Sequence, residues 1–122
     1  MTLPQANYEN KTQSELLDEM VKAIVEAIAP DKIILFGSQA RGTAGIHSDY
    51  DFLIIDPVPF GKEHSRRSTS RKVWDALFSF RVPADVLLYN ATEVEYLSRS
   101  LNHVVACALR EGKVLYERSY SS

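Results

Sequence analysis

Two aspartates and a glycine-serine pair are the residues of this sequence whose types and spacing best suit chemistry. Asp49 and Asp51 stand two residues apart at the start of an apolar run, and ten residues separate Asp49 from Gly37-Ser38. A spacing of two along a strand puts both carboxylates on one face, about 7 Å apart at the backbone. Two Mg²⁺ ions about 3.5–4 Å apart need such oxygen ligands and are completed by water and substrate phosphates. The pattern therefore predicts a two-magnesium site that handles a phosphate-bearing substrate.

Gly37-Ser38 supplies the other half of this site. The pair falls where an apolar run ends and a short helix is expected, so free backbone N–H groups favour phosphate and Gly37 allows close approach. The lysine of a Walker loop is absent, which excludes a P-loop NTPase. Asp85 opens a later apolar run directly after Pro83-Ala84 and is the candidate third carboxylate, with Asp56 the nearest alternative acid.

Each of these residues alone has an ordinary structural explanation. An Asp-x-Asp pair at a turn is commonly a cap followed by a solvated strand end, and Ser38 could be a helix N-cap. Arg41 could form a surface ion pair, and Asp85 could cap a turn. The joint pattern of all of them between buried strands is hard to produce by packing needs alone.

The combined motif resembles the signature of the DNA polymerase β nucleotidyltransferase superfamily, most closely its minimal nucleotidyltransferases. The residues that carry the resemblance are Gly37-Ser38-x10-Asp49-x-Asp51, with Ala40-Arg41-Gly42 and Ser48 inside the motif and Arg110–Tyr116 at the end of the domain. The resemblance implies that Asp49, Asp51 and Asp85 are catalytic and hold metal. It also implies nucleotide binding by Gly37, Ser38, Arg41 and Ser48.

The resemblance further implies two Mg²⁺ ions as cofactors and ATP as the donor of AMP to a hydroxyl acceptor. Members of this size are commonly encoded beside a helical HEPN-type partner protein, which implies a toxin–antitoxin pair in which this chain is the antitoxin. Two other functions stay open. The chain could be a non-catalytic module that neutralises its partner by contact, or one subunit of a small-molecule nucleotidyltransferase.

The elements that must position these residues follow from apolar periodicity. Thr12–Glu15 reads as a capping box for a helix that ends before Pro30, and a second long helix is expected from about Lys62 to Phe80 with Trp74 in the core. Buried strands are expected at residues 32–36, 50–55 and 84–89, with a last short strand at 114–116. A capping box at Thr92–Glu95 opens a helical stretch that breaks near Ser100 and ends at Gly112. Its inward residues are expected to be Tyr96, Leu97, Leu101, Val104, Val105, Ala108 and Leu109. This alternation predicts an α/β domain, and the resemblance implies a single polymerase-β-like fold with a small mixed sheet flanked by helices.

Length and composition indicate the number of domains and the kinds of partner that the chain can bind. With 122 residues, 45% of them hydrophobic, one domain is expected over residues 12–117, between a flexible arm at 1–11 and a polar tail at 118–122. The net charge of −2 offers no global basic surface, so direct nucleic-acid binding is not expected. No apolar run suits a signal peptide or a membrane span, and we expect a cytoplasmic protein.

Two local features add to this. The single cysteine, Cys107, is expected to be a small buried hydrophobe. One end of the second long helix is basic and is either a solvated face or a contact for triphosphate or a negatively charged partner. Its cations are Lys62, Arg66, Arg67, Arg71 and Lys72.

Overall fold

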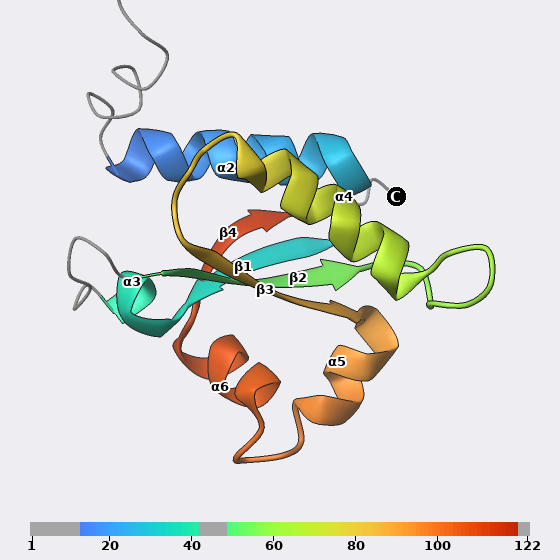
Figure 1. The fold of residues 1–122 in the computed structure, drawn as a ribbon. Helices are drawn as coiled ribbons and strands as arrows, with labels where there is room; N and C mark the ends of the chain where they lie inside the picture. Colours follow the sequence, from blue (N-terminus) through green and yellow to red (C-terminus); the bar gives the residue numbers. More distant parts are fainter. Residues whose placement is uncertain (1–12, 42–48, 120–122) are drawn as a thin grey trace, which may run out of the picture.

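A four-stranded mixed sheet with helices on both faces carries the fold (Figure 1). The structure is a computed structural model that describes residues 13–41 and 49–119. The sheet order is β3-β2-β1-β4; β2 and β3 run parallel, whereas β1 is antiparallel to both β2 and β4. The strands are β1 (Lys32–Phe36), β2 (Tyr50–Asp56), β3 (Ala84–Asn90) and β4 (Lys113–Glu117).

Among the residues that the structure describes, two helices cover each face of this sheet, and a fifth lies at its end. In Figure 1, α2 and α4 lie over one face, α5 and α6 lie under the other, and α3 follows β1 directly. Their bounds are α2 (Gln13–Ile28), α3 (Gly37–Arg41), α4 (Arg66–Phe78), α5 (Ala91–Leu97) and α6 (Val104–Glu111). The α/β architecture predicted from the sequence is therefore confirmed.

The central strands β1 and β2 are buried on both faces, which explains their continuous apolar runs. Alternate residues such as Leu35 and Phe52 pack with the α2 and α4 side chains, for instance Ile24. The intervening residues, among them Leu53, pack with Val105 and its neighbours in a second cluster on the other face. Two small cores thus hold the sheet rigidly from both sides.

Two helix starts differ from the prediction because other side chains supply the caps. Helix α4 begins at Arg66 rather than Lys62, since the Ser65 side chain accepts a hydrogen bond from the backbone N–H of Ser68. Strand β3 runs one residue further than expected, and Asn90 caps α5 in place of Thr92. The Asn90 side chain accepts from the Glu93 N–H at 2.9 Å, and the Glu93 carboxylate accepts from the Asn90 N–H at 2.9 Å.

Several apolar residues expected in the core are exposed instead. Trp74, which was expected in the core, is 41% exposed, because the neighbouring positions, which include Leu77, fill the core-facing row of α4. Phe78, at the end of the same helix, is 79% exposed. On the face of the sheet that α5 and α6 cover, three residues that were predicted to point inward are also exposed. They are Tyr96, Leu101 and Val104. The helical stretch does break around Ser100, as expected, between α5 and α6.

Other predictions fall partly or wholly outside the described residues. The Thr12 cap, the arm at 1–11 and Gly42 lie there, whereas Gly112 ends α6 as predicted and donates its N–H to the Ala108 carbonyl. Cys107 is half-buried rather than buried. No helix in the described ranges is both long enough and apolar enough to cross a membrane.

Candidate active site

The parallel pairing of β2 and β3 brings two of the predicted acids to adjacent positions. Asp51 and Asp85 are register partners, so their backbones are about 4.8 Å apart, the usual spacing of neighbouring strands. A hydrogen bond of 2.9 Å from the Tyr50 N–H to the Pro83 carbonyl ties the two strand starts together. Residues 34 positions apart in sequence therefore meet at one end of the sheet.

Gly37 lies against the first of these acids. Phe36, the last residue of β1, is the antiparallel register partner of Asp51, and Gly37 follows with a positive φ of 75°. A Cβ at position 37 would lie only 2.3 Å from Asp51 Oδ2. Only glycine leaves this space open and adopts the left-handed conformation without strain.

The structure describes some of the other predicted site residues fully and others only in part or not at all. Ser38 is half-buried in the first turn of α3, and Asp49 is exposed one residue before β2, at strand spacing from Asp51. Ser48 lies outside the described residues. Arg41 ends α3, and its side chain is not described.

The side chains do not form a ready metal cluster. Within the described ranges, no group of three His, Cys, Asp or Glu side chains is gathered closely enough to hold an ion. Asp85 is turned toward its own strand, where Oδ1 accepts from the Val86 N–H at 3.0 Å. The residues still fit Mg²⁺ in kind, because all three candidate ligands are carboxylates. They also fit in place, because Asp51 and Asp85 are register partners on neighbouring strands and Asp49 precedes Asp51 at strand spacing.

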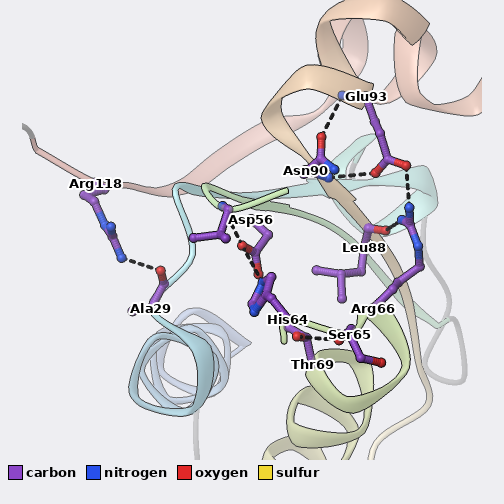
Figure 2. A network of polar contacts seen from close by, with 11 residues as sticks. Ala29, Asp56, His64, Ser65, Arg66, Thr69, Leu88, Asn90, Glu93 and Arg118 are labelled. Atoms are coloured by element: carbon purple, nitrogen blue, oxygen red, sulfur yellow. Dashed lines mark hydrogen bonds and ion pairs between the residues drawn. The ribbon is translucent and has the colours of Figure 1, made fainter. Parts of the chain in front are cut away.

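A second polar group, at the opposite end of β3, was not predicted. Figure 2 shows Arg66 between the Leu88 carbonyl, to which its Nη1 donates at 2.6 Å, and the carboxylate of Glu93. The guanidinium also lies 4.4 Å from the Phe60 ring centroid. Arg66 thus fastens α4 to β3 and α5, and it is not a free cation at the Asp85 end of the strand.

The charge on Glu93 is stabilised by this arrangement. Partial burial raises the pKa of Glu93, but hydrogen bonds from the Arg66 side chain and the Asn90 backbone, together with the Arg66 charge, outweigh it. The net result is a pKa below the usual 4.5. Glu93 therefore stays ionised and keeps both its capping and its pairing role.

Asp56 has a similar structural role. It is 1% exposed at the end of β2, where Oδ1 accepts from the Val58 N–H at 2.9 Å and lies 3.0 Å from His64 Nε2 (Figure 2). This carboxylate holds the loop before α4. It lies at the far end of β2 from Asp51, which argues against it as the third acid.

Comparison with known proteins assigns the family. The family model of the nucleotidyltransferase domain matches residues 15–107, a range that includes every predicted site residue. The chain belongs to the nucleotidyltransferase domain family. This membership confirms the enzyme class and the minimal-nucleotidyltransferase resemblance drawn from the Gly37-Ser38 and Asp49-x-Asp51 motif.

Individual proteins resemble the chain in sequence or in fold. The chain is 27% identical over 113 residues to a candidate protein adenylyltransferase of Methanocaldococcus jannaschii, covering 90% of this chain and 76% of that protein. A crystal structure of a candidate nucleotidyltransferase from Sulfolobus solfataricus shares the fold, with a TM-score of 0.53, 17% identity and coverage of 89% and 92%. A toxin–antitoxin crystal structure with AMP-PNP matches with a TM-score of 0.48, 23% identity and coverage of 83% and 73%.

Proposed function

We propose that this nucleotidyltransferase is a magnesium-dependent protein adenylyltransferase, which moves AMP from ATP to a hydroxyl of a partner protein. The observation that carries the proposal is the position of the Asp51 carboxylate against Gly37 and in register with Asp85. Carboxylates on two neighbouring strands, beside a glycine at the start of a helix, suit a phosphate chain with its metal ions. A protein acceptor is supported by the name of the Methanocaldococcus jannaschii relative.

In this proposal the three acids have distinct tasks. Asp49, Asp51 and Asp85 would together hold two Mg²⁺ ions. When bound, Mg²⁺ neutralises phosphate charge and lowers the pKa of a coordinated hydroxyl. Asp85 orients the acceptor hydroxyl and accepts its proton, which requires the carboxylate to leave the Val86 N–H.

Gly37 and Ser38 position the donor. Gly37 leaves room for the phosphates, and the Ser38 hydroxyl and backbone N–H donate to them. The acceptor oxygen then bonds to the α-phosphorus, the bond from that phosphorus to the bridging oxygen breaks, and pyrophosphate leaves. The chain contributes placement and charge neutralisation and forms no covalent intermediate.

A HEPN-type protein is the partner that the family resemblance favours, with this chain as its antitoxin. The test is intact-mass spectrometry of such a partner after incubation with ATP, Mg²⁺ and a substoichiometric amount of the chain. Turnover should add the mass of one or more AMP groups to a molar excess of partner, because an enzyme acts repeatedly.

Variants separate this reading from its competitors. Asp51→Asn and Asp85→Asn should each abolish the added mass, whereas Ser38→Ala should only reduce it, since backbone N–H groups remain. Near-normal turnover by Asp85→Asn would show that the third acid is misassigned. If the double variant Asp49→Asn, Asp51→Asn neutralised the partner at the same low dose without added mass, the chain would be a binding module. Pyrophosphate release with small hydroxyl compounds but not with protein would favour the small-molecule alternative.

A further inference from the structure

Helix α4 presents a continuous row of large side chains to solvent. Arg67, Arg71, Trp74 and Phe78 follow at intervals of four, three and four residues, so they lie along one line of the helix surface. Trp74 is 41% and Phe78 79% exposed, whereas Val73 and Leu77, on the side of the helix that faces the sheet, are buried. We call these four residues the α4 stripe.

The apolar end of the stripe borders a groove. Trp74 and Phe78 line a hollow of about 440 Å³ together with Val82 and Ala84, which lie on the chain that leads from α4 into β3. Ala84 faces the α4 side of β3 together with Val86, whereas Asp85 points to the opposite side, which carries Leu87 and Tyr89. The groove therefore lies on the α4 side of the sheet, at the edge that β3 forms.

The stripe is positively charged on a chain whose net charge is −2. Arg67, Lys72 and Arg81 make no ion pair with any residue in the described ranges, and Arg71 reaches Asp75 only at 4.0 Å with both side chains largely exposed. Such a pair contributes little. The cations around the α4 stripe are thus available to an acidic partner, and Asp75 is the single acid among the residues of α4.

We propose that the α4 stripe is a docking surface for an acidic, amphipathic helix of another protein. Its apolar side chains would enter the groove beside Trp74 and Phe78, and its carboxylates would face Arg67 and Arg71. Two aromatic anchors one helical turn apart, flanked by arginines, are typical of helix-in-groove recognition and of binding hot spots. A nucleic acid is less suited, because the net charge is negative and the groove floor is apolar rather than a basic track.

Docking at this surface goes beyond the proposed function, because the groove lies on the α4 side of the sheet and the Asp85 side chain lies on the other. The docking depends only on the α4 stripe and not on the proposed transfer reaction.

Trp74 gives a direct readout because it is the single tryptophan of the chain. The probe is a synthetic helical peptide of about five turns, free of aromatic residues, with leucines along one face and glutamates on the others. Titration should shift Trp74 emission to shorter wavelength in a saturable manner, since docking removes the indole from water. The same peptide with lysine in place of glutamate should leave the emission unchanged.

Variants locate the contact. Phe78→Ser removes an apolar anchor and Arg67→Glu reverses a charge, and each should weaken peptide binding by about tenfold or more. Tyr96→Ser is the matched control, since Tyr96 is 74% exposed on α5, across the sheet, and its variant should bind within about twofold of the unaltered chain. Circular dichroism checks that each variant is folded, which the exposure of all three side chains favours.

Four outcomes would overturn the proposal. These are the absence of a saturable shift, equal weakening by Tyr96→Ser, tighter binding of oligouridylate than of the acidic peptide, and burial of Trp74 by self-association in a sedimentation series without peptide. Asp51→Asn separates docking from catalysis, because it should bind the peptide as the unaltered chain does. In the unaltered chain, absence of transfer with intact docking counts against the proposed function alone, whereas absence of docking counts against the α4 stripe alone.

Discussion

Replacing Gly37 with alanine should damage the fold and the nucleotide site together. The φ of 75° at this residue is a left-handed conformation, which costs a residue with a Cβ about 1–2 kcal/mol. The new Cβ would also lie 2.3 Å from Asp51 Oδ2. A normal contact is more than about 1 Å longer, so the carboxylate must move away.

The expected size of the effect follows from these two terms. The obstructing atom is the end of a side chain that can rotate, so we expect the backbone strain to dominate and the total loss to be about 2 kcal/mol. For a chain of this length that corresponds to a fall in Tm of roughly 8 °C. Displacement of Asp51 should in addition weaken the binding of Mg²⁺ with an ATP analogue by about tenfold or more.

Two other glycines serve as matched controls. At Gly112 an added Cβ would meet the Ala108 carbonyl oxygen at 2.4 Å and the Leu35 carbonyl oxygen at 2.9 Å, so alanine there should lower Tm without a specific effect on nucleotide binding. At Gly61 an added Cβ has no neighbour within 4 Å, and alanine should change neither property. Thermal unfolding and nucleotide titration on all three variants check the reasoning. If Gly37→Ala kept both its Tm and its nucleotide affinity, the close approach of Asp51 to residue 37 would be refuted.

Three further substitutions probe the parts of the fold that hold the site. Phe52→Ala empties a fully buried position in β2 and should cost about 3–5 kcal/mol in urea unfolding; a loss under 1 kcal/mol would contradict the packing described. Asn90→Ala removes the α5 cap and should cost about 1 kcal/mol, whereas an unchanged unfolding midpoint would mean that Thr92 caps the helix after all. Because the pKa of Glu93 is lowered in the folded state, its contribution to stability is present above its usual 4.5 and is lost as the pH falls through the folded value. Glu93→Gln should therefore reduce the acid dependence of the unfolding free energy below pH 4.5, and an unchanged profile would remove the ion pair from the account.

Sequence patterns predicted the elements that depend on contiguous residues. The apolar runs of β1 and β2 and the cap at Gly112 are local signals, and they appear as expected. The pattern also placed Asp51 near the start of a strand. Sequence patterns did not predict its position opposite Asp85, because the parallel pairing of two strands separated by α4 is a long-range property. The family resemblance implied only that both acids belong to one site.

Packing decided the features that the sequence left undetermined. In α4, Val73 and Leu77 form one possible apolar row and Trp74 and Phe78 another, and periodicity alone does not say which row faces the sheet. The sequence predicts Trp74 in the core, and the structure exposes it. Arg66 was predicted to be one of several cations at the basic end of this helix. Its ion pair with Glu93 joins residues 27 positions apart in the sequence, so no local pattern indicates it.

The central claim is that Asp51, beside Gly37, helps to form a site for Mg²⁺ and a nucleoside triphosphate. Isothermal titration calorimetry with Mg²⁺ and α,β-methylene ATP, which cannot be cleaved between the α and β phosphorus atoms, tests it most directly. The unaltered chain should show saturable binding that requires Mg²⁺, and folded Asp51→Asn should bind at least about tenfold more weakly. Absence of binding by the unaltered chain at millimolar Mg²⁺, or equal binding by Asp51→Asn, would contradict the account.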